Sequence, residues 1–389
     1  MIFIRESLML VFSQNVVTIW MVIATLCIIL LFNTRFFAFL DAEHLGREIN
    51  KELIGLRFFL ALGVVFHHYI FSYKFSLSGL WESRGFEFNC FLGPFGVGLF
   101  FVISGYLFYS VINSDTNWPK LFVNRFFRIA PLCLVSSLVC VIIAIGMGGW
   151  HISDENARDI IYWFDSGVYN YRPDISSYKG ADLINAGVTW TLYWEWLFYF
   201  SLPLLSLLVI KGGKLPLVIS LLLISYYVFP YFNYNYAIYS ALFSFGFLAR
   251  DLSLKIKSKI ILNFGPIALF AGLLWALGYH VVGNKFLTLP ALPFMTLFFI
   301  ILINENSLFG LLRNKGVVRL GGISYSIYLL HGIVWFSLNH LVDTKSVGVI
   351  TYLMQSTLAL VLIMLISVLT YKYIEIPFNH LGRMIRDKM

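Results

Sequence analysis

The sequence predicts an all-α, polytopic membrane protein, a bundle of about eleven transmembrane helices. Three observations lead to this class: 59% of the residues are hydrophobic, only 12% are charged, and the mean hydropathy is +0.80. Soluble domains have about half apolar and about a quarter charged residues, so this chain has too little charge to cover a globular surface. A soluble enzyme, a disordered chain and a coiled coil are therefore excluded.

Eleven apolar segments are candidates for membrane-spanning helices, each of which needs about 20 residues. The first segment follows a leader that is not basic, because Arg5 and Glu6 cancel, and no small-residue cleavage site comes after it. We therefore expect it to be retained rather than removed as a signal peptide. Two short segments, 215–231 and 235–250, could instead form one re-entrant hairpin. The predicted spans are 13–33, 54–73, 91–111, 129–149, 190–210, 215–231, 235–250, 260–281, 287–304, 322–341 and 349–371.

Lysine and arginine are unevenly distributed over the predicted loops. Alternate loops contain 20 of these residues on one side and 8 on the other, which accounts for all 28. By the positive-inside rule, the N-terminus lies outside and the C-terminus in the cytoplasm. We expect an extra N-terminal helix and loop (1–49), a membrane domain (50–380) and a basic cytoplasmic tail (381–389). The longest loop, at 150–189, is expected outside.

The second predicted span contains ionisable residues, which are costly inside a membrane and are therefore candidates for function. Arg57 lies at its cytoplasmic mouth, and His68 follows eleven residues later. At about 1.5 Å and about 100° per residue, the two side chains share one helix face and lie about 16 Å apart. An anionic ligand held at Arg57 could thus reach a chemical centre at His68. Alternatively, Arg57 anchors a helix end and His68 forms a hydrogen bond within the bundle.

Small residues are concentrated in the third predicted span. Gly96, Gly98 and Gly105 thin this helix and would let neighbouring helices approach closely. Ser104 could line a cavity beside them. We expect packing to be the main role of this segment.

Two further segments place charge near the ends of predicted spans. Arg125 and Arg128 are neighbours on one helix face and could grip a phosphate together, or they could only anchor the helix. Glu195 lies among the aromatic residues from Trp190 to Tyr199. It could act as an acid or base or as the partner of a histidine, or it could belong to an interfacial aromatic belt.

The tenth predicted span begins with a polar stripe. Ser324, Tyr328 and His331 are spaced i, i+4 and i+7 on one helix face. The stripe either provides hydrogen bonds within the bundle or lines a substrate path. Glu375, near the end of the last span, is expected to bond a neighbouring arginine. We find no spacing or cluster typical of a metal site, and we expect the four cysteines to be core thiols.

Taken in order, these segments resemble the acyltransferase 3 family of integral membrane acyltransferases. Each motif is weak alone, but six occur in register and cover about residues 50–380. The motifs are Gly55–Arg57 with His68, Gly98–Tyr106, Arg125–Pro131, Trp190–Tyr199, Ser324–His331 and Glu375–Pro377. The resemblance implies a core of ten spans in the bacterial cytoplasmic (inner) membrane, to which this chain adds one N-terminal span. His67 falls outside the family's spacing, and we assign it no role.

The resemblance also implies an activity. Family members transfer an acyl group, usually acetyl, from cytoplasmic acyl-CoA to a sugar hydroxyl of a surface glycan such as lipopolysaccharide O-antigen, capsule, exopolysaccharide or peptidoglycan. Some members carry a fused extracellular esterase-like domain. We expect this chain to act without one, which argues against peptidoglycan as the acceptor. The expected partners are acyl-CoA, membrane lipid and a lipid-linked or surface glycan, with no nucleic acid.

Roles can then be assigned to individual residues. Acetyl-CoA would be a co-substrate rather than a tightly bound cofactor, and its predicted phosphate ligands are Arg57, Arg125 and Arg128. His68 would be the general base or a transient acyl acceptor, and Glu195 would orient or recharge it or bind the acceptor sugar. The residues expected to line the substrate path are Ser104, Trp190, Tyr199, Tyr328 and His331. The alternative function is a proton-coupled transporter or flippase, which would show a repeat symmetry that we do not find in the sequence.

Overall fold

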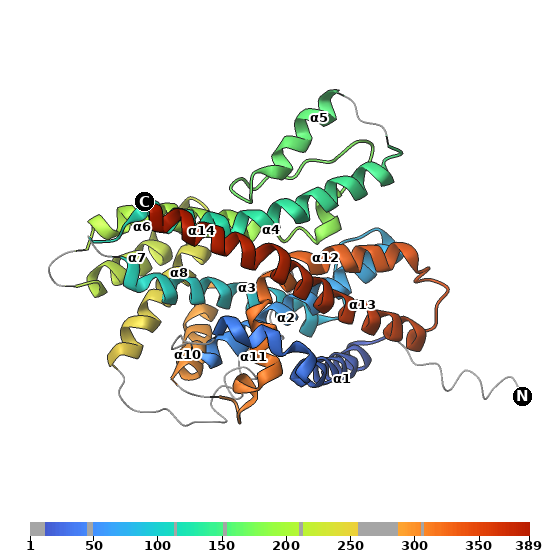
Figure 1. Ribbon diagram of the computed structural model, residues 1–389, viewed down its shortest axis with the longest axis horizontal. Helices are drawn as coiled ribbons and strands as arrows, with labels where there is room; N and C mark the ends of the chain where they lie inside the picture. Colours follow the sequence, from blue (N-terminus) through green and yellow to red (C-terminus); the bar gives the residue numbers. More distant parts are fainter. Residues whose placement is uncertain are drawn as a thin grey trace, which may run out of the picture.

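The computed structural model describes residues 12–44, 50–112, 115–150, 154–209, 213–255, 287–304 and 307–389. Within these ranges the chain forms helices and no β-strand. Most of the long helices run along the long axis of the molecule and form one bundle (Figure 1). The α-helices are α1 (Gln14–Asn33), α2 (Lys51–Ser78), α3 (Glu87–Phe108), α4 (Trp118–Met147), α5 (Asp154–Ile161), α6 (Trp190–Leu207), α7 (Leu215–Tyr227), α8 (Tyr234–Lys255), α10 (Leu292–Ile303), α11 (Lys315–Gly322), α12 (Ser324–Leu341), α13 (Val349–Thr370) and α14 (Ile376–Lys388).

The predicted spans can be compared with these helices. Ten of the eleven predicted ranges overlap a helix, and the other, 260–281, lies outside the described residues. By length and composition, five helical segments of the described chain could cross a membrane: α1, α2, α3 with the turn that follows it, α4, and the α13–α14 pair. A sixth is added if α11 and α12, which meet at a bend of 73°, form one span. The structure therefore confirms an all-helical membrane bundle, but not the count of eleven spans.

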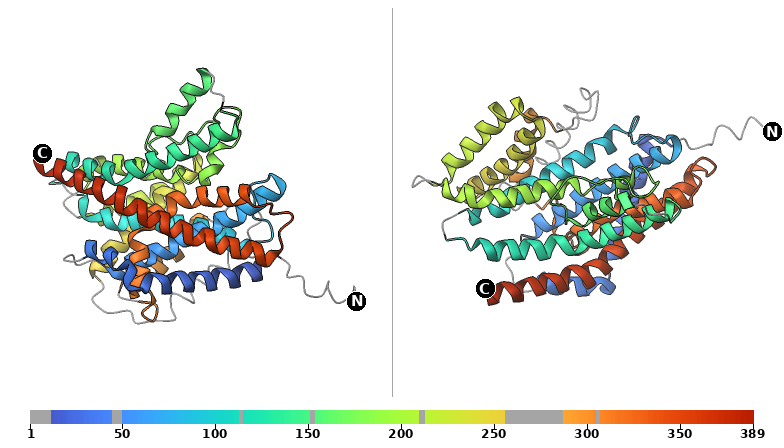
Figure 2. Two further views of the ribbon diagram at one scale, coloured as in Figure 1. Left: turned by 45° about the vertical axis from the view of Figure 1, so that its right-hand side comes forward. Right: turned by 90° about the horizontal axis from the view of Figure 1, so that it is seen from above.

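Helix α2 is largely buried and lies at the centre of the bundle (Figure 2). The side chain of Asn50 caps its first turn by accepting a hydrogen bond from the N–H of Leu53 at 2.8 Å. Gly79 ends the helix in a left-handed conformation, with φ at 72°. Between these caps the helix is continuous, so Arg57 and His68 lie on one rigid element, as their spacing predicts.

Glycine residues bring α3 and α8 into backbone contact. A Cβ atom on Gly105 would lie 2.1 Å from the carbonyl oxygen of Phe243, and one on Gly246 would lie 2.2 Å from that of Val102. No side chain fits at either position, so the two helices approach as closely as their backbones allow. The packing role predicted for the glycines of the third span is confirmed at Gly105.

The segment between α5 and α6 is folded against the bundle. The sequence predicts a long external loop at 150–189; the side of the membrane on which it lies stays a prediction, but much of the segment is packed rather than open. Trp163 and Ile184 are fully buried, and a Cβ atom on Gly332, near the middle of α12, would lie 2.2 Å from the backbone of Asn185. The apolar residues of the segment drive this burial. The segment leads into α6, which starts at Trp190, where the fifth predicted span also begins.

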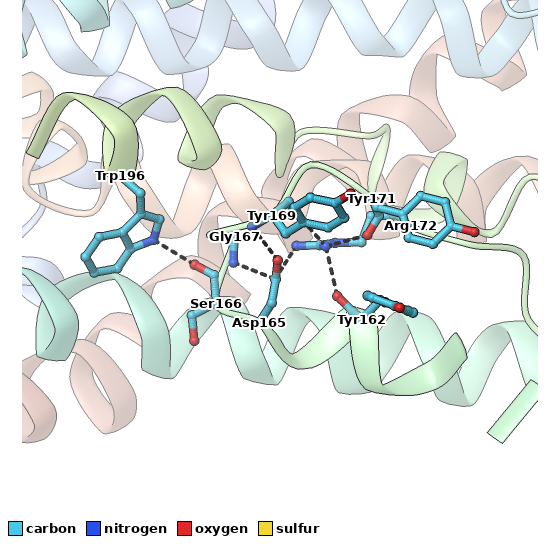
Figure 3. A network of polar contacts seen from close by, with 8 residues as sticks. All are labelled: Tyr162, Asp165, Ser166, Gly167, Tyr169, Tyr171, Arg172 and Trp196. Carbon is cyan, nitrogen blue, oxygen red and sulfur yellow. Dashed lines mark hydrogen bonds and ion pairs between the residues drawn. The ribbon is translucent and has the colours of Figure 1, made fainter. Parts of the chain in front are cut away.

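An ion pair stabilises this folded segment (Figure 3). Arg172 donates a hydrogen bond to Asp165 at 2.7 Å and three more to backbone carbonyl oxygens. Asp165 in turn accepts hydrogen bonds from two backbone N–H groups at 2.8 and 2.6 Å. Trp196 of α6 donates to the carbonyl oxygen of Ser166 at 3.0 Å. The segment is thereby attached to the helix that carries Glu195.

The extra N-terminal helix is an integral part of the bundle. Arg319 of α11 donates to both carboxylate oxygens of Asp41, at 2.8 and 2.6 Å, and to the carbonyl oxygen of Phe32 at 2.7 Å. Trp20 of α1 donates to the hydroxyl of Thr357 on α13 at 2.9 Å. At the other end of the chain, a π-helical turn (Tyr371–Glu375) joins α13 to α14, which continues through most of the predicted tail.

Several loops predicted as cytoplasmic meet at one end of the bundle, which we call the basic end. Arg313, just before α11, forms an ion pair with Glu52 at the start of α2. Lys214, just before α7, donates to the carbonyl oxygen of Tyr109 after α3 at 2.7 Å. This clustering agrees with the uneven distribution of basic residues. The side of the membrane that the basic end faces stays a prediction.

Candidate active site

A cavity of about 310 Å³ lies between α2, α3, α4, α6 and α12. We call it the arginine cavity, because three of its lining residues are the arginines singled out in the sequence. Its polar lining residues are Arg57, Ser104, Arg125, Arg128, Thr191, Glu195, Tyr199, Ser324, Tyr325 and Tyr328. The remaining lining side chains are apolar, so the cavity combines an apolar wall with a concentrated set of cationic and hydroxyl groups, as ligand sites do.

The three guanidinium groups of this cavity have no close ion-pair partner in the described part of the chain. Arg57, Arg125 and Arg128 make no hydrogen bond or close ion pair with a described residue, and the Nε of Arg57 is buried without a partner. Arg125 lies over the rings of Phe108 and Tyr199, at 5.2 and 6.0 Å from their centroids. A buried polar group without a partner is costly. Such a cluster is therefore suited to an anionic ligand that supplies the missing acceptors.

Glu195 also lines the arginine cavity. It lies one helical turn before Tyr199 on α6, and the hydroxyl of Tyr199 donates a hydrogen bond to its carboxylate. From the sequence, Glu195 is expected to orient or recharge His68 or to bind the acceptor sugar. The structure places its side chain in the arginine cavity rather than the histidine cavity, and its role stays a prediction.

A second cavity, of about 290 Å³, contains the histidines, and we call it the histidine cavity. Its polar and aromatic lining residues are His67, His68, Trp190, Tyr234, Asn235, Tyr239 and Tyr328. Val97 and Tyr328 line both cavities. The arginine and histidine cavities are therefore neighbours that share these two side chains as a boundary.

Within the histidine cavity, His68 makes a hydrogen bond to a second histidine. The Nδ1 of His68 lies 2.9 Å from the Nε2 of His331 on α12, and the Nδ1 of His331 lies 3.1 Å from the carbonyl oxygen of Ile327. His331 is fully buried and lines neither of the two cavities. His331 therefore contacts His68, and its expected contact with substrate stays a prediction.

The other predicted site residues are divided between the two cavities. Ser104 and Tyr199 line the arginine cavity, Trp190 lines the histidine cavity and Tyr328 lies at their boundary. Thr191 is a lining residue that was not predicted from the sequence; its hydroxyl lies 3.0 Å from that of Tyr328. Its position beside Trp190 within the aromatic motif is the signal that could have identified it.

His67 also lines the histidine cavity, although the sequence analysis assigns it no role. Its Nδ1 lies 3.0 Å from the carbonyl oxygen of Asn89, and its ring centroid lies 4.8 Å from that of His68. Two adjacent histidines in one predicted span were the only sequence signal for it. Among the described residues, no group of three His, Cys, Asp or Glu side chains could hold a metal ion.

Comparison with known proteins places this arrangement in a family. Residues 50–372 match the family described as "Acyltransferase domain". The chain belongs to this acyltransferase family. The matched region contains α2 to α13 and therefore every residue that lines the two cavities. The expectation based on the sequence motifs is confirmed.

Individual relatives of this acyltransferase are distant. It is 23% identical over 366 residues to the O-acetyltransferase OatA of Staphylococcus aureus, a match that covers 85% of this chain and 57% of the relative. It is 28% identical over 176 residues to nodulation protein 10 of Rhizobium leguminosarum bv. viciae, covering 41% of this chain and 44% of the relative. The chain thus spans just over half the length of OatA. No solved structure matches it significantly.

Proposed function

We propose that this acyltransferase moves an acetyl group from acetyl-CoA to a sugar hydroxyl of a cell-surface polysaccharide, such as lipopolysaccharide O-antigen, capsule or exopolysaccharide. One observation carries the proposal: three guanidinium groups that make no hydrogen bond or close ion pair with a described residue line a cavity that adjoins the cavity of His68. The name of the relative OatA, an O-acetyltransferase, supports the choice of acetyl group and of an oxygen acceptor.

The donor would enter the arginine cavity. Coenzyme A carries several phosphate groups, and arginine binds phosphate through paired, charge-assisted hydrogen bonds. The cavity volume, about 310 Å³, is at the small end of the range for ligand pockets, so it suits the narrow pantetheine arm better than the whole molecule. The nucleotide would remain at the basic end, and the thioester would point toward Val97 and Tyr328.

The reaction needs a base for the hydroxyl group and a donor for the developing oxyanion. The hydroxyl oxygen attacks the thioester carbon, forming the new C–O bond while the C–S bond breaks. His68 takes the hydroxyl proton and returns it to the sulfur of coenzyme A. The hydroxyl of Tyr328 lies at the boundary of the two cavities, 3.3 Å from the carbonyl oxygen of Val188 and 3.0 Å from the hydroxyl of Thr191. It would stabilise the oxyanion by turning its hydrogen from these partners to the carbonyl oxygen of the thioester.

The proposal also includes an orientation in the bacterial inner membrane. The basic end would face the cytoplasm, where acetyl-CoA is available, and the N-terminus would lie outside. The histidine cavity would receive the acceptor from the membrane or from its outer side. The expected acceptor is a lipid-linked or surface glycan, which fits the aromatic side chains of Trp190, Tyr234 and Tyr239 around this cavity, because aromatic rings stack on the apolar faces of sugars.

The test is His68→Ala in cells that carry this protein, with the acetyl content of the surface polysaccharide measured by NMR. We expect the O-acetyl signals to disappear at an unchanged protein level. The matched control is His380→Ala, an exposed histidine of α14, which should retain full acetylation. Normal acetylation in His68→Ala would refute the role of His68, and purified protein that does not bind acetyl-CoA would favour a transporter instead.

A further inference from the structure

The hydrogen-bond chain behind His68 determines which of its nitrogens carries a proton. The carbonyl oxygen of Ile327 can only accept, so the Nδ1 of His331, 3.1 Å away, must carry a hydrogen. In a neutral imidazole the other nitrogen is then a lone-pair acceptor. The Nε2 of His331 therefore accepts, and the Nδ1 of His68, 2.9 Å away, must donate.

This leaves the Nε2 of His68 as the unprotonated nitrogen. It makes no hydrogen bond with any described residue, and His68 lines the histidine cavity. A general base needs a lone pair that faces its substrate. The chain of donors and acceptors that begins at a backbone carbonyl thus prepares His68 in the form that can take a proton from the cavity.

The two helices are held in register on either side of this pair. Trp335, one turn after His331 on α12, is fully buried and donates to the carbonyl oxygen of Val65 on α2 at 3.0 Å. The rings of His68 and His331 lie nearly parallel, with centroids 5.1 Å apart and an angle of 21° between them. The His68–His331 contact is therefore part of a close-packed helix interface.

We propose that His331 is a positioning residue that holds His68 in the tautomer with a free Nε2. This inference rests on the proposed role of His68 as the base. When His68 takes up the substrate proton, both of its nitrogens carry hydrogen, and its Nδ1–H continues to donate to His331. A neutral histidine thus occupies the place that a carboxylate occupies in a serine–histidine–aspartate triad.

The first experiment compares two substitutions at position 331. Glutamine can place an oxygen near the position of Nε2 and still accept from His68, whereas phenylalanine fills the space without an acceptor. We expect His331→Phe to lower kcat by about 100-fold, the lower end of the roughly 100- to 10,000-fold that acid–base catalysis contributes, with the KM for acetyl-CoA unchanged. His331→Gln should recover most of this loss.

A matched control is available on the same helix. His340 repeats the bond of His331 to the carbonyl four residues earlier, with its Nδ1 2.9 Å from the oxygen of Phe336, but it lines a different cavity near the far end of α12. His340→Phe should retain normal kcat. Normal kcat in His331→Phe would overturn the proposal, and so would a failure of His331→Gln to recover activity in a protein that is folded.

A second experiment does not depend on turnover. Nitrogen-15 NMR of histidine-labelled protein, with the signals of His68 assigned by their loss in His68→Gln, reports which ring nitrogen is protonated. We expect a protonated Nδ1 and a free Nε2 in the unsubstituted protein and in His331→Gln, and mixed tautomers in His331→Phe. A protonated Nε2 in the unsubstituted protein would overturn the proposal. If that protein transfers no acetyl group, the proposed function fails, and the NMR result still tests His331.

Discussion

Arg57 is half-buried on α2, and its buried Nε has no partner in the described chain. The charge of Arg128 repels that of Arg57, and the carboxylates of Glu195 and Glu375 offset part of this repulsion. An anionic ligand would replace the repulsion with charge-assisted hydrogen bonds, each contributing about 1.5–3 kcal/mol. The arginine cavity is therefore suited to an anionic ligand, which would relieve the repulsion between Arg57 and Arg128.

We expect Arg57→Gln to weaken acetyl-CoA binding by about 10-fold to about 100-fold, since it removes one charge-assisted interaction. Arg57→Lys should weaken it less, because lysine retains the charge but not the planar fork. Calorimetric titration of purified protein with acetyl-CoA measures both. Arg383→Gln, a change of a basic residue on α14 that does not line the cavity, is the control. Unchanged binding in Arg57→Gln would remove Arg57 from the donor site.

At the scale of the element, backbone contacts between helices position the cavities. Gly105 lies next to Ser104 of the arginine cavity, so the α3–α8 contact fixes the wall from which that hydroxyl projects. The folded segment before α6 is attached to the helix that carries Glu195, because Trp196 donates a hydrogen bond to the carbonyl oxygen of Ser166. The sequence predicts the glycine packing from composition, but it does not predict the buried path of this segment.

The glycine contact can be tested by adding one methyl group. Gly105→Ala places a Cβ atom 2.1 Å from the carbonyl oxygen of Phe243, so α3 and α8 must separate, and we expect a cost of about 1–3 kcal/mol. Thermal unfolding in detergent, followed by size-exclusion chromatography, measures this loss. Gly348→Ala is the control, because a Cβ atom there meets nothing within 4 Å. Equal stability of the two variants would contradict the close approach.

The ion pair of the folded segment gives a second test at this scale. Arg172 and Asp165 are mostly buried, with 7% and 18% of their side chains exposed. Removing one partner of a buried pair costs about 3–5 kcal/mol, so Arg172→Gln should increase hydrogen exchange over residues 162–189. The double variant Arg172→Gln with Asp165→Asn should lose less stability than the sum of the losses in the two single variants. Strictly additive losses would mean that the pair does not stabilise the segment.

At the scale of the whole molecule, the basic loops and the arginine cavity lie at one end of the bundle. The ion pair of Arg313 with Glu52 and the bond of Lys214 to Tyr109 connect loops that are far apart in the sequence. The N-terminal helix α1 joins this end through Arg319. If the arginine cavity binds the donor and His68 is the base, as proposed, this arrangement would allow transfer from one side of a membrane toward the other.

The predicted orientation can be measured by labelling intact cells with a membrane-impermeant maleimide. We expect Ser346→Cys, in the loop before α13, to be labelled from outside, and Arg386→Cys, near the end of α14, only after the cells are permeabilised. The parent protein, whose four cysteines are free, measures the background. The reverse pattern would invert the orientation and place the arginine cavity on the side without acetyl-CoA.

By itself, the sequence determines what depends on local order along the chain. The length of the apolar segments and the low charge determine that the chain lies in a membrane. Helical periodicity puts Arg57 and His68 on one face of α2. Only the tertiary structure decides which groups meet across helices. It places Glu195 with the arginines and gives the position beside His68 to His331, which is 263 residues away in sequence. The contact of His68 with His331 depends on the register of α12 against α2, which results from packing rather than from any local pattern.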